Sequence, residues 1–86
     1  VMTRITVQCS TGEGNIANIL ADVEACHEGV SIGSYPWMKP GQFGTAIVVS
    51  GLDAAVATSA ARTVEAEVRN FGAEANIVNA DGTLAD

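Results

Sequence analysis

The sequence VSIGSYPWMKPGQFGTAIVVSG, residues 30–51, decides the fold that we predict for this chain. Residues 30–35 and 45–51 are rich in the β-branched and aliphatic side chains typical of strands, and Pro40-Gly41 between them is a turn signal. Because proline lacks a backbone donor, we expect Pro36 either to end the first strand or to confine it to a sheet edge. The segment therefore predicts two strands that follow one another in the middle of the chain.

Regular patterns on both sides of this segment complete a β-α-β-β-α-β order. Residues 4–9 alternate like a half-buried strand, and residues 16–27 carry an apolar stripe at helical spacing. Asp53 is placed to cap a second, long helix, and residues 74–78 form a last short strand. We therefore predict an α+β, ferredoxin-like fold, with a four-stranded antiparallel sheet and two helices on one face.

Length and composition predict one small domain. The chain has 86 residues, and we expect an ordered core of residues 3–79 followed by a tail, residues 80–86. Cys9 and Cys26 lie at opposite ends of the first predicted helix, and about 11 helical residues separate them by roughly 16 Å. A disulfide needs much closer Cα atoms, so we predict free thiols and a cytoplasmic protein.

The charge of the chain excludes some classes of partner. The net charge is −6, with only four basic residues. Nucleic acids and anionic membrane surfaces are bound through clustered Lys and Arg, so we expect neither as a partner. No apolar run approaches the roughly 20 residues that a membrane-spanning helix needs.

The aromatic residues are concentrated in the central segment, which we predict to be an interaction surface. The chain has one Trp, one Tyr and two Phe, and three of these four side chains fall within residues 35–43. Such residues are frequent in binding hot spots, although the segment could also simply cover one end of the sheet. Both helices cover one sheet face, and our register places Ile47 and Val49 on the other, exposed to a second copy, a neighbouring domain or a ligand. The predicted surface comprises Gly33, Ser34, Tyr35, Pro36, Trp37, Phe43, Ile47 and Val49.

No group of residues in the sequence predicts catalysis or metal binding. Adjacent helical residues point about 100° apart, so Cys26 and His27 diverge, and Cys9 lacks a nearby base. The glycine-containing loop at residues 10–14 lacks the spacing of a dinucleotide fingerprint, and Ser10 and Glu13 fit a helix capping box instead. We therefore predict no catalytic, cofactor-binding or metal-binding residue in this segment.

The motif Gly33-Ser34-Tyr35-Pro36 carries a family resemblance, together with residues 12–17 and 43–51. The chain resembles the segment that follows the molybdopterin-binding, molybdenum-cofactor biosynthesis-type domain of competence/damage-inducible protein A (CinA)-like proteins. A related segment accompanies that domain in some FAD synthetases. The resemblance implies a piece of a longer protein, in which molybdopterin or a nucleotide, and any pyrophosphatase-type activity, belong to the other domain.

The resemblance implies a non-catalytic accessory domain that packs against its neighbouring domain or forms a homo-oligomer. An alternative is an ACT-like module that senses an amino acid, because such domains share the element order and often carry a glycine in the first strand–helix loop. Amino-acid binding near residues 10–15 would favour the alternative. An independent enzyme would need a nucleophile oriented by a base, which we do not find in the sequence.

Overall fold

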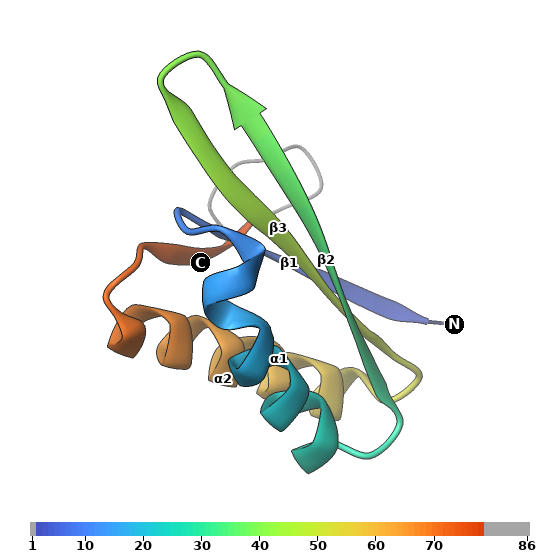
Figure 1. Ribbon diagram of the computed structural model, residues 1–86. Coiled ribbons are helices and arrows are strands. Elements are labelled where there is room, and N and C mark those ends of the chain that lie inside the picture. Colours follow the sequence, from blue (N-terminus) through green and yellow to red (C-terminus); the bar gives the residue numbers. More distant parts are fainter. Residues whose placement is uncertain (1, 79–86) are drawn as a thin grey trace.

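The computed structural model describes residues 2–78 and confirms the predicted ferredoxin-like α+β fold (Figure 1). The predicted tail, and residue 79 of the predicted core, lie outside the described residues. The strands pair antiparallel in the spatial order β2-β3-β1-β4. The elements are β1 (Thr3–Cys9), α1 (Glu13–Cys26), β2 (Val30–Lys39), β3 (Gln42–Gly51), α2 (Ala54–Phe71) and β4 (Ala75–Val78).

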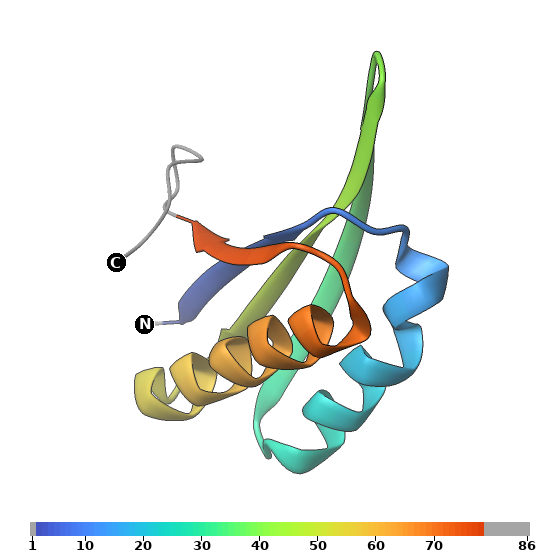
Figure 2. The same ribbon diagram turned by 90° about the vertical axis from the view of Figure 1, so that its left-hand side faces the viewer.

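Both helices lie against one face of the sheet, as Figure 2 shows, and no other element of residues 2–78 covers the opposite, open face. α2 is capped as predicted, because the Asp53 side chain accepts hydrogen bonds from the backbone N–H groups of Ala55 and Val56 at 2.9 and 3.2 Å. Gly72 ends the helix in the left-handed region, at φ 111°. The buried side chains of α2 are small and let the helix approach the sheet closely: Ala57, Ala60, Ala61, Val64 and Val68.

The start of α1 differs from the prediction. The helix begins after Gly12, which has no side chain to cap it, and no capping box forms between Ser10 and Glu13. The Ser10 hydroxyl instead accepts a hydrogen bond from the backbone N–H of Glu74 at 2.9 Å. Ser10 directly follows β1 and Glu74 directly precedes β4, so the Ser10 side chain joins these two strands at one end of their pairing and does not cap the helix.

The predicted exposure of Ile47 and Val49 is wrong. Both side chains are 0% exposed and lie in the core beneath the helices. The pairing explains this, because Ile47 lies opposite Val7 and Val49 opposite Ile5, and these residues of β1 face the helices. Side chains alternate between the two faces of a sheet along a strand. The prediction assigned the residues of β3 to the wrong faces, which placed Ile47 and Val49 on the open face instead of in the core. These two residues therefore belong to no interaction surface.

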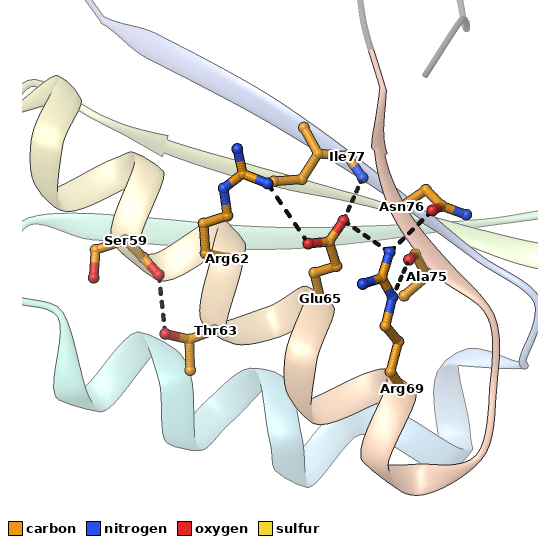
Figure 3. A network of polar contacts seen from close by, with 8 residues as sticks. All are labelled: Ser59, Arg62, Thr63, Glu65, Arg69, Ala75, Asn76 and Ile77. Carbon is orange, nitrogen blue, oxygen red and sulfur yellow. Dashed lines mark hydrogen bonds and ion pairs between the residues drawn. The ribbon is translucent and has the colours of Figure 1, made fainter. Parts of the chain in front are cut away.

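The open backbone edges of the sheet are capped by helix carboxylates. On β4, Glu65 accepts a hydrogen bond from the Ile77 N–H at 3.0 Å and pairs with Arg69 at 3.4 Å, and the Arg69 Nε donates to the Ala75 carbonyl (Figure 3). On β2, Glu24 accepts from the Ile32 N–H at 2.7 Å. Occupied edge groups are unavailable to a strand from another chain, so these contacts protect the sheet from edge-to-edge association.

Candidate functional site

The central hairpin is longer than the sequence predicted. β2 continues through Pro36 to Lys39, and β3 begins at Gln42, so that only Pro40 and Gly41 form the turn. Gly41 has φ 75°, as the third residue of a type II turn requires. β2 is an outer strand, so Pro36 is confined to a sheet edge, which was the second of the two predicted alternatives.

The end of this hairpin projects beyond the rest of the sheet, as Figure 1 shows. β1 ends at Cys9, which pairs with Thr45, whereas β2 and β3 continue for three further pairs, Trp37–Gly44, Met38–Phe43 and Lys39–Gln42. We name residues 37–44 the arm. A two-stranded ribbon is at best marginally stable in water, so the base of the arm needs support from the domain.

Trp37 provides this support on the open face of the sheet. Its indole Nε1 donates a hydrogen bond to the Gln8 side-chain oxygen of β1 at 3.0 Å. The ring lies over Gly44, where an added Cβ would be 2.6 Å from Trp37 Cζ2 and would collide with the Cys9 carbonyl. The Lys39 ammonium lies 5.6 Å from the centre of the ring, within the range of a cation–π contact. Trp37 therefore joins both strands of the arm to the neighbouring strand β1.

The opposite face of the arm presents apolar side chains to solvent. Met38 and Phe43 form a cross-strand pair and are 84% and 56% exposed. The Phe43 ring is close to the loop before α1, 3.9 Å from the position that a Cβ on Gly12 would take. Such a pair contributes little to an isolated domain, because most of its surface stays in water. It is available to a partner.

The outer edge of β2 does not favour addition of another strand. The Val30 N–H is bonded to the His27 carbonyl at 3.2 Å and the Ile32 N–H to Glu24. These residues point their backbone groups outward, and every second residue along an antiparallel edge strand does the same, which includes Pro36. Pro36 has no N–H to offer, so a strand added along this edge would lack a hydrogen bond at the base of the arm, which favours binding through side chains.

A hollow of about 490 Å³ lies where the arm meets the end of β1 and the start of β4. Its polar lining consists mainly of amide and hydroxyl groups and one carboxylate. Cys9 also lines it, but the thiol is 3% exposed and donates to the Thr45 carbonyl at 3.4 Å. Catalysis by the Cys9 thiol would need a base beside it to activate the thiol. The polar lining residues are Gln8, Ser10, Gln42, Glu74 and Asn76.

The remaining candidate residues are separate from this hollow. Cys26 is exposed at the end of α1, and both cysteines are free, as predicted. His27 Nδ1 lies 2.8 Å from the Val23 carbonyl, a hydrogen bond that holds the end of the helix. Within residues 2–78, no three His, Cys, Asp or Glu side chains are placed to hold a metal ion. In the same residues, neither helix is long and apolar enough to cross a membrane.

Comparison with known families assigns the chain to one of them. A family model described as "FAD synthase, middle domain" matches residues 2–76. The chain belongs to the FAD synthase middle domain family. The match includes both helices, all four strands except the last residues of β4, and the whole arm.

Membership of the FAD synthase middle domain family corrects the earlier assignment. The chain resembled a domain of CinA-like, molybdopterin-binding proteins, and the family match overturns that assignment and the function derived from it. The ACT-like alternative has no support either. The Gly33-Ser34-Tyr35-Pro36 motif did not separate the two families, because a related segment occurs in FAD synthetases as well.

Two further comparisons concern sequence and fold. No curated protein matches the chain. Among solved structures, the de novo designed protein Foldit4 is similar, with a TM-score of 0.72, 12% sequence identity, and coverage of 90% of this chain and 93% of that chain. At this identity the likeness shows the fold alone.

The structure brings the predicted surface residues together on the hairpin but divides them between its two faces. Met38 and Gln8 were missed, although a two-residue turn at Pro40-Gly41 already pairs position 38 with position 43. Nothing local in the sequence indicates that Gln8 binds Trp37, 29 positions away. Gly33, Tyr35 and Trp37 lie on the open face, and Ser34, Pro36 and Phe43 on the helix side.

Proposed function

We propose that this chain is a non-catalytic docking domain of a FAD synthase-type protein, and that its arm binds a neighbouring domain of that protein. The single observation that carries the proposal is the exposure of Met38 and Phe43 at the end of a paired ribbon that projects past the sheet. An apolar pair held away from its own core is typical of an interface.

The architecture of the arm supports this role. Trp37 and Gly44 hold its base against β1, so the arm is ordered before it meets a partner, which reduces the entropy lost on binding. The capped edge and Pro36 disfavour partners that would add a strand. The partner we propose therefore contacts the arm through apolar side chains on the helix side.

The name of the family supports the choice of partner. A middle domain has neighbours on both sides, so the surface nearest to the arm would be another domain of the same FAD synthase-type protein. The predicted homo-oligomer was based partly on Ile47 and Val49, which are buried, so self-association has lost that support. The free thiols of Cys9 and Cys26 support the cytoplasm as the compartment.

The test compares one substitution in two settings. Met38→Ser should change the free energy of unfolding of the isolated chain by less than about 0.5 kcal/mol, because an exposed side chain makes few contacts. In the longer FAD synthase-type protein, the same substitution should destabilise this domain by about 1–2 kcal/mol, since the side chain is buried there. Thermal unfolding followed by calorimetry measures both.

Leu52→Ser is the matched control, because Leu52 is 75% exposed but lies between β3 and α2, away from the arm. It should change neither protein by more than about 0.5 kcal/mol. Equal effects of Met38→Ser in the isolated chain and in the longer protein would refute docking through the arm. A concentration-dependent dimer of the isolated chain that Met38→Ser abolishes would assign the arm to a second copy instead.

A further inference from the structure

The distribution of charge sets the open face apart from the rest of the molecule. The chain has a net charge of −6, yet the four strands contain no Asp or Glu and hold two of the four basic residues, Arg4 and Lys39. Every carboxylate within residues 2–78 lies on a helix or in a connection. The other two basic residues, Arg62 and Arg69, are paired with Glu65 on α2. The cations without an ion pair among the described residues therefore belong to the strands.

Arg4 lies at the end of the open face opposite to the arm, in a row with two hydroxyl side chains. It pairs with Ser50 of β3, which in turn pairs with Ser31 of β2, so that the three side chains lie side by side on one face. A hollow of about 430 Å³ opens over this row. Gly33 and Tyr35, which follow Ser31 along β2, also line it.

Tyr35 directs its hydroxyl toward the same row. A Cβ on Gly33 would lie 3.2 Å from the Tyr35 hydroxyl oxygen, so the ring leans back along β2 over Gly33, in the direction of Ser31. This contact explains why a glycine precedes the tyrosine by two residues in the Gly33-Ser34-Tyr35-Pro36 motif. The motif positions a phenol at the edge of the hollow.

The Arg4 guanidinium and the hydroxyl groups of Ser31 and Tyr35 are the donors of this hollow, because the Ser50 hydroxyl donates to the Ser31 carbonyl at 3.4 Å, and the lining holds no anionic side chain. Within residues 2–78, neither the Arg4 guanidinium nor the Tyr35 hydroxyl is bonded to another side chain, and no carboxylate lines the hollow. A guanidinium with hydroxyl groups around it matches a phosphate, whose oxygens accept hydrogen bonds in several directions. We propose that this hollow binds the phosphate or pyrophosphate group of a small molecule.

The proposal does not depend on the docking role of the arm, because the two sites use different residues at opposite ends of β2. It is tested by titrating the isotope-labelled chain with inorganic pyrophosphate and following its backbone amide NMR signals. At about 0.15 M salt the Debye length is about 8 Å, so contacts in the hollow persist while the repulsion from distant carboxylates is screened. Saturable shifts are expected at Ser31, Gly33 and Ser50.

Substitutions identify the site. Arg4→Gln should raise the Kd about tenfold or more, because it removes a charge-assisted contact. Arg62→Gln is the matched control, since it changes the net charge equally but lies on α2, and it should leave the Kd within about twofold of the original value. Tyr35→Phe removes one hydroxyl only and should raise the Kd by a smaller factor than Arg4→Gln. The amide spectrum of each variant shows directly that it is folded.

Four results would overturn the proposal. These are the absence of saturable shifts, equal loss of affinity in the two arginine variants, shifts centred on residues 12–15 at the start of α1, and equally tight binding of acetate, which would make the hollow a carboxylate site.

Discussion

Replacement of Gly44 by Ala tests the packing that holds the arm to the domain. The added Cβ would lie 2.6 Å from Trp37 Cζ2 and 2.9 Å from Cε2, and it would also collide with the Cys9 carbonyl. That carbonyl cannot move freely, because Cys9 is paired with Thr45 on one side and Ala75 on the other. Rotation of Trp37 relieves only the clash with its ring and breaks its hydrogen bond to Gln8, whereas the clash with the Cys9 carbonyl requires a shift of the backbone.

The expected loss of stability has two parts, the overpacking around the new Cβ and the lost hydrogen bond. Overpacking in a well-packed site costs about 1–3 kcal/mol, and loss of a hydrogen bond about 0.5–1.5 kcal/mol, so Gly44→Ala should destabilise the chain by roughly 2–4 kcal/mol. Urea unfolding monitored by fluorescence measures this directly, since Trp37 is the only tryptophan and reports on its own surroundings. The native-state emission should also shift to the red as the indole becomes more exposed.

Gly14→Ala provides the control of opposite sign. Gly14 lies in the first turn of α1, and a Cβ there would meet nothing within 4 Å. Because alanine is the better helix former, this substitution should stabilise the chain by about 0.5–1 kcal/mol.

If Gly44→Ala left the stability and the emission of Trp37 unchanged, the account of how the arm is supported would be refuted.

Three further substitutions test the scaffold. Asp53→Ala removes the cap of α2 and should lower the free energy of unfolding by about 1 kcal/mol, as measured by urea unfolding; an unchanged midpoint would contradict the capping role. Glu65→Ala leaves the Ile77 N–H without its partner, and hydrogen exchange of that amide should accelerate while exchange in β3 stays slow; equal exchange in both would contradict edge protection. Thr45→Val removes a buried hydrogen bond to the Thr11 carbonyl, 2.9 Å long, and should destabilise the chain by about 1–3 kcal/mol, whereas a neutral effect would show that the carbonyl finds another donor.

Local patterns predicted the order of elements well. Asp53 and Gly72 mark the ends of α2 by chemistry that depends on a few neighbouring residues, and Pro40-Gly41 fixes the turn of the hairpin in the same way. Where the outcome depends on distant partners, the sequence was a poor guide. Ile47 and Val49 stand in an apolar run that fits either face, and only the register with Val7 and Ile5 decides between them.

In the candidate site too, local features could be predicted from the sequence and contacts between distant residues could not. The concentration of aromatic residues in one connection drew attention to the hairpin, because such residues are scarce elsewhere in the chain, and the interaction surface proposed there stays a prediction. The sequence did not show that Trp37 braces the arm against Gln8, or that Tyr35 leans over Gly33, since both arrangements arise from pairing between strands. The family could not be read from the Gly33-Ser34-Tyr35-Pro36 motif alone, because related proteins share it.

The docking role of the arm is tested most directly by amide hydrogen exchange of residues 37–44, measured in the isolated chain and in a longer FAD synthase-type protein that carries it. The arm is already paired in the isolated chain, so any added protection reports on a partner rather than on folding. We predict exchange at least about tenfold slower in the longer protein, with unchanged rates in α2, whose buried face is already covered. Equal rates for residues 37–44 in both proteins would contradict the account.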